Sequence, residues 1–107
     1  MIIEWRPLIE IFHNNERIGH VELSPRRTEA LPRVGEFVGF SEDPICEALE
    51  LKSSITYVPV VTAVHHLIDP EGAEVSVHIK MKTYRDEAGT TRLAEENGIH
   101  WLPDSPA

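Results

Sequence analysis

The sequence contains only one cysteine, Cys46, which excludes a disulfide bond within the chain. Residues 1–7 carry neither a basic cluster nor a long apolar run, so no secretory signal is predicted and a cytoplasmic location is expected. The longest apolar stretch, residues 58–68, is interrupted by Pro59, Thr62 and two histidines, and it is shorter than a membrane span. We therefore expect no association with a membrane.

Basic side chains are also scarce. The 107 residues include ten of Lys and Arg against eighteen of Asp and Glu, a net charge of −8. Such a chain repels nucleic acid and anionic lipid, so neither is an expected partner. The acids concentrate in residues 41–51 and 84–107, whereas residues 52–83 have no net charge. The length predicts a single domain, residues 1–102, followed by a flexible tail, residues 103–107.

Residues 57–83 predict one long β-hairpin, around which the fold is organised. Residues 57–68 are rich in β-branched side chains, and residues 74–83 alternate between apolar and polar ones. This alternation places four side chains on the core face: Val75, Val77, Ile79 and Met81. The turn between the strands has Asp, Pro and Gly in the order of a type I turn closed by a glycine bulge, which would pair Asp69 with Ala73.

A second hairpin is predicted nearer the N-terminus. Residues 8–13 and 17–23 flank Asn14, Asn15 and Glu16, and asparagine tolerates the left-handed conformation that tight turns require. The loop could contain two residues or three, and a one-residue shift moves every side chain to the other face of the sheet. The sequence therefore predicts these strands without their register.

The connector between the hairpins predicts one short helix. Asp43 suits the N-terminal cap and Pro44 the first helical position. Ile45, Ala48 and Leu49 then fall on one side, as expected for a helix that packs on a sheet.

The C-terminal part of the chain leaves two alternatives open. Residues 90–93 could form a sixth strand, or residues 92–96 one helical turn that ends at Asn97 and Gly98. The apolar residues 99–102 are expected to pack back on the domain, because an exposed tryptophan forfeits the free energy of burial.

The order of these elements resembles that of a known kind of small fold. A bend at Pro32, Val34, Gly35 and Glu36, a short strand at residues 36–40, a connector and a long hairpin are similar to the small, bent β-barrels of the SH3-like kind. The resemblance implies a fold but no functional residue. The predicted fold class is mainly β: a small antiparallel, strongly bent sheet or an SH3-like small barrel of five to six strands, with one short helix in the connector.

Six histidines are candidate metal ligands. In the predicted register His66 and His78 share the polar face of the hairpin. Another strand could complete a zinc site with His20, His13 or a carboxylate such as Glu22. The alternative is that these histidines lie on a solvated sheet face. No catalytic or nucleotide-binding motif is recognisable, Cys46 is expected to be a core thiol, and no cofactor is predicted.

These observations predict a non-enzymatic module that binds another protein. Four charged residues are candidate contacts: Glu47, Glu50, Arg26 and Arg27. A homodimer is a further candidate, because Val60, Val64 and Ile68 would lie on the polar face and edge strands offer free hydrogen bonds. The alternative function is a histidine-based barrel that binds a metal or another ligand and could be catalytic.

Overall fold

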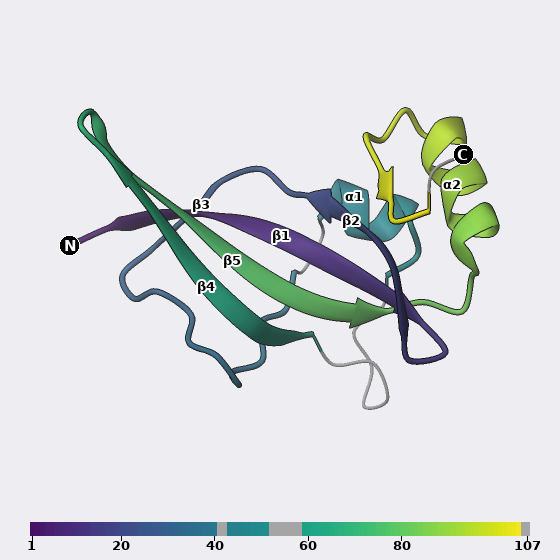
Figure 1. Ribbon diagram of the computed structural model, residues 1–107, viewed down its shortest axis with the longest axis horizontal. Coiled ribbons are helices and arrows are strands. Elements are labelled where there is room, and N and C mark those ends of the chain that lie inside the picture. The colour runs from purple at the N-terminus through teal and green to yellow at the C-terminus, as the bar shows by residue number, and fades with distance from the viewer. Residues whose placement is uncertain (41–42, 52–58, 106–107) are drawn as a thin grey trace.

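A computed structural model of the chain describes residues 1–40, 43–51 and 59–105. The described residues form six strands and two helices, so the fold is mainly β, as predicted (Figure 1). The strands are β1 (Ile3–His13), β2 (Glu16–Glu22), β3 (Arg26–Thr28), β4 (Val60–Asp69), β5 (Gly72–Lys82) and β6 (Leu102–Pro103), and the helices are α1 (Pro44–Ala48) and α2 (Glu87–Glu96). The predicted start of the long strand, at Tyr57, lies outside the described residues.

The strands form one mixed sheet in the order β4-β5-β1-β2-β6, with β3 paired to the first part of β1. The predicted antiparallel arrangement holds for four of the five strand pairings. The fifth is parallel: β1 lies beside β5 from the pair Arg6 and Ser76 to the pair Phe12 and Lys82. The prediction of an entirely antiparallel sheet is therefore wrong, because the two hairpins join through strands that run in the same direction.

The described strands also do not close into a barrel, since β4 and β6 lie at the two ends of the strand order. The short strand predicted for residues 36–40 is reduced to a single bridge between Phe37 and Val60 at the outer edge of β4. The observed architecture is an open sheet, and the SH3-like resemblance extends only to a small, mainly β domain.

The N-terminal hairpin takes the shorter of the two predicted loops. Asn14 and Asn15 both have positive φ, 50° and 65°, and the pair His13 and Glu16 flanks them. Two consecutive left-handed residues match the twist of the flanking strands, which favours a two-residue turn. With this register, Ile9 of β1 points into the core.

The register of the long hairpin differs from the prediction by one residue. Asp69 pairs with Gly72 instead of Ala73, and its Oδ1 accepts hydrogen bonds from the backbone N–H groups of Glu71 and Gly72 at 2.9 and 3.0 Å. The bulge that was predicted beside the glycine lies instead at Thr62, between two shifted pairs. Side chains of β4 from residue 63 to residue 69 are therefore on the face opposite to the predicted one.

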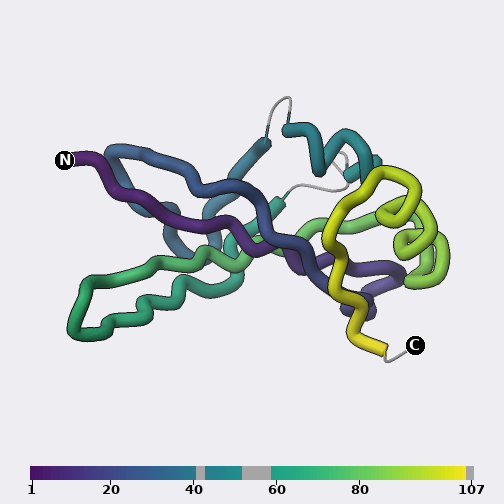
Figure 2. The backbone as a smooth tube through the Cα atoms, turned by 90° about the horizontal axis from the view of Figure 1, so that it is seen from above, coloured from purple at the N-terminus to yellow at the C-terminus, as the bar shows by residue number. Residues whose placement is uncertain are grey.

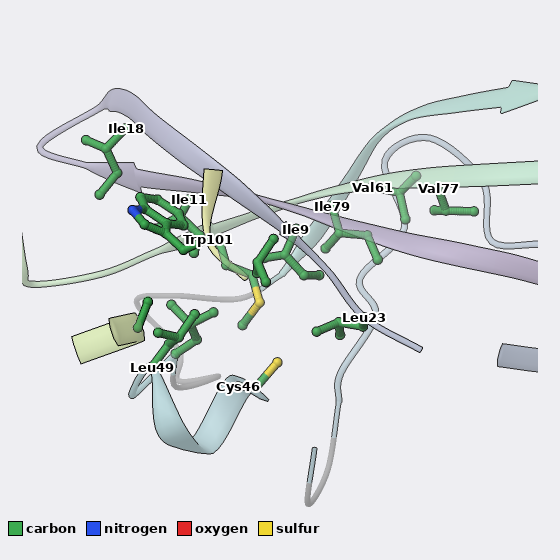
Figure 3. Packing of buried hydrophobic residues seen from close by; sticks show 14 of the residues in the cluster. Ile9, Ile11, Ile18, Leu23, Cys46, Leu49, Val61, Val77, Ile79 and Trp101 are labelled. Carbon is green, nitrogen blue, oxygen red and sulfur yellow. The ribbon is translucent and has the colours of Figure 1, made fainter. Parts of the chain in front are cut away.

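The core lies between the sheet and the helices. Val77, Ile79 and Met81 of β5 are buried in it and Val75 is half-buried, which confirms the predicted core face of this strand. Helix α1 begins as predicted, because Asp43 accepts hydrogen bonds from the backbone N–H groups of residues 45 and 46 and Pro44 follows it. Figure 3 shows α1 below the strands, with the side chain of Cys46 directed at them.

For the C-terminal part, the helical alternative is correct, but the helix is longer than one turn. Helix α2 begins after Asp86, whose Oδ1 accepts the N–H of Gly89, and ends at Asn97, before Gly98 at φ 66°. The chain then returns to the sheet, as expected: Trp101 is buried, and its Nε1 donates to the hydroxyl of Thr91 at 2.9 Å.

The sheet extends past the part that the helices cover. Figures 1 and 2 show the tip of the β4–β5 hairpin and the N-terminal part of β1 at one end of the molecule, and α2 with the C-terminal segment at the other. None of the described helices is long and apolar enough to cross a bilayer.

Candidate functional site

One face of the sheet faces the helices, and the other, which we call the open face, does not. The open face carries Arg6, Leu8, Glu10 and Phe12 of β1, Arg17, His20 and Glu22 of β2, Val60, Thr62, Ala63, His65 and Leu67 of β4, and Glu74, Ser76, His78, Lys80 and Lys82 of β5. None of these side chains is fully buried, whereas Cys46 of α1, Leu49 at its C-terminal end and Ala94 of α2 belong to the core on the other side. The described part of the chain therefore leaves a broad sheet surface exposed.

The centre of the open face is a polar cluster around Glu10. Arg17 places its Nε 3.1 Å from Oε2 of Glu10, and the hydroxyl of Thr62 donates to Oε1 at 3.0 Å. His78 approaches the same Oε1 to 3.7 Å, and His20 lies directly opposite Glu10 on β2. Strands β1, β2, β4 and β5 therefore all contribute to one cluster, although residues 10 and 78 are far apart in sequence.

The cluster includes a pair of imidazoles in contact, with their ring planes tilted by 37°. The rings of His65 and His78 lie 4.3 Å apart, centroid to centroid. Burial lowers the pKa of His78 below its usual value, and the neighbouring His65 lowers it further, while Glu10 acts in the opposite direction. The His78 imidazole is therefore neutral at pH 7, and its contact with Glu10 is not a full ion pair.

Of the three histidines that were predicted to share a metal, the structure separates His66 from the other two. His66 lies opposite Val75, on the other face of the sheet from His78 and His20. Among residues 1–40, 43–51 and 59–105, no group of three or more His, Cys, Asp or Glu side chains has an arrangement that could hold a metal ion. The one-residue error in the hairpin register brought His66 into the prediction in place of His65.

Arg26 and Arg27, which were predicted as partner contacts, differ in their surroundings. Arg26 forms an ion pair with the buried carboxylate of Asp43, donates to the backbone and hydroxyl oxygens of Ser24, and lies over the ring of Phe40 at 5.6 Å. These contacts tie β3 to the cap of α1, so Arg26 supports the fold. Arg27 is exposed and lies 3.8 Å from a carboxylate oxygen of Glu4.

The acidic pair predicted as a contact lies at α1. Glu47 is exposed in the first turn of the helix, where a negative charge stabilises the helix dipole. Glu50 follows the helix with φ 55° and forms an ion pair with Arg85, which precedes α2. Because α1 packs on the covered face, both glutamates lie away from the Glu10 cluster.

Cys46 is buried between α1 and the sheet, which confirms the predicted core thiol. Burial raises the pKa of this thiol to about 12, and the carboxylate of Asp43 adds to the effect. The reactive thiolate is therefore scarce at neutral pH, and Cys46 is not suited to be a nucleophile.

Few features of the sequence indicate the cluster that the structure assembles. Glu10 and Arg17 belong to unremarkable alternating strands, and only the parallel pairing of β1 with β5 brings them to His78. Comparisons with protein families, curated proteins and solved structures found no match, so function must be argued from the surface itself.

Proposed function

We propose that this protein is a non-enzymatic module that binds another protein through its open face. The observation that carries the proposal is the contrast between the two faces of the sheet: one packs on both helices, and the other presents a broad surface that no described residue covers. A broad, solvent-exposed sheet surface suits recognition of a folded partner better than enclosure of a small substrate.

The chemistry of the open face suits a polar protein interface. Arginine and aromatic side chains are enriched at protein interfaces, and this face presents Arg6 and Arg17 with the half-buried ring of Phe12. Lys80 extends over that ring at 4.4 Å from its centroid. A lysine in such a position covers apolar surface while its ammonium group stays in water.

Charge on this surface differs from charge on the rest of the chain. Four basic side chains, Arg6, Arg17, Lys80 and Lys82, stand beside four acidic ones, Glu10, Glu22, Glu74 and the Asp104 that binds Arg17. The whole chain has eighteen acids against ten bases. The open face is therefore balanced within an acidic protein, and we expect a partner whose surface combines both signs of charge.

The test is affinity capture from the native cell extract, followed by calorimetric titration of the purified pair. Reversing two charges on the open face, Lys80→Glu with Lys82→Glu, should weaken binding at least tenfold. Glu95→Lys with Glu96→Lys on the exposed side of α2 is the matched control and should leave the affinity unchanged. If Glu47→Lys weakens binding and the open-face change does not, the contact is the acidic surface of α1 instead.

The alternative function, binding of a metal or another ligand by histidines, is supported by the contact between His65 and His78 beside Glu10. Imidazole is a ligand that zinc accepts, but no third ligand among the described residues is arranged to complete a site with these two rings. Stoichiometric metal in protein purified without a tag, and its loss in His65→Ala and His78→Ala, would favour this alternative over protein binding.

A further inference from the structure

Strand β4 has a free edge over most of its length. One edge pairs with β5, and the other is occupied only at its start, where Gly35 donates its N–H to the carbonyl of Val61 at 2.9 Å and Val61 donates to Glu36 at 2.9 Å. Beyond that point no other described strand pairs with this edge. We call residues 63–68 of β4 the free edge.

The backbone groups that this edge presents follow from the hairpin. In a two-residue hairpin the pair that flanks the loop exchanges both backbone hydrogen bonds, and outward and inward groups then alternate along each strand. Asp69 flanks the loop, so the N–H and C=O groups of Val64, His66 and Ile68 point away from β5. Three donors and three acceptors are thus available to another strand.

The free edge lacks the usual protection against pairing. Exposed edges in proteins are commonly guarded by charged side chains or proline. Residues 60–68 contain no Asp, Glu, Lys, Arg or Pro, although the whole chain has eight prolines and twenty-eight charged side chains. At its end Leu67 and Ile68 are 65% and 76% exposed, on opposite faces of the sheet.

We propose that the free edge pairs antiparallel with the free edge of a second copy of this chain, so that two sheets join into one. The absence of charge on this edge favours it as the contact. Two chains of net charge −8 repel each other, and pairing through an uncharged strand places no like charges directly opposite one another. A two-fold axis perpendicular to the sheet pairs residues of the same face. With the axis at His66, Ile68 lies opposite Val64 of the second copy, and Leu67 opposite His65.

This arrangement accounts for two observations at once. It supplies partners for the outward backbone groups, and it covers both exposed apolar side chains at the end of β4. The contact is short, well below the area of a typical stable interface, so we expect a dissociation constant in the micromolar range or weaker. The proposal concerns a strand edge and is independent of partner binding at the open face.

The experiment is sedimentation velocity over a range of concentrations. The wild type should change from the mass of one 12.1 kDa chain to the mass of two as concentration rises. His66→Pro removes an outward N–H that β5 does not use, and Ile68→Lys places a charge on the edge. Both variants should lose the dimer with unchanged circular dichroism, and if His66→Pro does not fold, Ile68→Lys alone decides.

The matched control is Ala73→Lys. Ala73 lies directly opposite Ile68 on β5, so this change adds the same charge to the same face of the hairpin tip, one strand away from the free edge. It should keep the dimer. A wild type that remains a single chain at every concentration overturns the proposal, and so does a dimer that survives both edge variants.

Discussion

The two ends of the β4–β5 hairpin are built alike in sequence but differ in environment. At the covered end Val77 and Ile79 are 0% exposed, and at the projecting end Leu67 and Ile68 are 65% and 76% exposed. Both ends carry β-branched or aliphatic side chains on paired strands. The comparison teaches that the residue pattern produces the strand, whereas burial depends on what packs over it, which here is the helices and the C-terminal segment.

The largest expected difference in stability is between two isoleucine-to-alanine changes, one at each end of the hairpin. Ile79→Ala should lower the free energy of unfolding by about 2–5 kcal/mol, because it leaves a cavity in the core. Ile68→Ala should change it by less than about 0.5 kcal/mol in dilute solution, where the side chain is in water. Urea unfolding monitored by tryptophan fluorescence measures both, and equal effects would contradict the division of the hairpin into two environments.

A second prediction concerns the contact that completes the covered end. A Cβ atom on Gly19 would lie 2.5 Å from the ring of Trp101 and from the carbonyl oxygen of Leu102. Gly19→Ala should therefore cost about 1–3 kcal/mol by displacing this segment from β2.

The control for Gly19→Ala is Gly39→Ala, because a Cβ atom there meets nothing within 4 Å. Thermal unfolding of the two variants should show a lower midpoint only for Gly19→Ala. An unchanged midpoint for both would mean that Trp101 does not pack against β2.

A third prediction uses the buried thiol of the covered end as a pH probe. The pKa of Cys46 is about 12 when folded, against 9.0 ordinarily. Between these values the folded state holds a proton that the unfolded state has lost, so the free energy of unfolding falls as pH rises, by up to about 1.4 kcal/mol per pH unit. Urea titrations at several alkaline pH values measure this dependence. In Cys46→Ala, the part of the decrease in unfolding free energy that the thiol causes should disappear.

The smallest effect is expected on the open face. Lys80→Ala removes only the contact between the ammonium group and the ring of Phe12, worth about 0.5–1 kcal/mol at an exposed site. Chemical denaturation should detect little or no change. A loss as large as that of Ile79→Ala would show that the two faces of β5 are reversed.

Local sequence signals predicted local structure well. The alternation of β5 placed Val77 and Ile79 in the core, and the order of Asp43 and Pro44 placed the start of α1. These predictions succeed because one residue and its near neighbours decide strand alternation and helix capping.

Long-range arrangement was not predictable in the same way. The parallel pairing of β1 with β5 depends on how two separate hairpins meet, for which no short motif exists. The register of the long hairpin depends on whether its loop has two residues or three. The wrong loop length placed His66 on the open face, where the structure has His65. Helix α2 was underestimated because the weak helix formers Gly89, Thr90 and Thr91 interrupt its first half.

The parallel pairing of β1 with β5 has a consequence for the order of folding. Each hairpin closes over a two-residue loop, which takes microseconds, whereas this ladder joins residues 6–12 to residues 76–82 and must first close a long loop. We therefore expect the meeting of the two hairpins to be the rate-limiting step. In stopped-flow experiments Ile9→Val and Ile79→Val should slow refolding, whereas Leu49→Ala, at the C-terminal end of helix α1, which docks afterwards, should mainly accelerate unfolding.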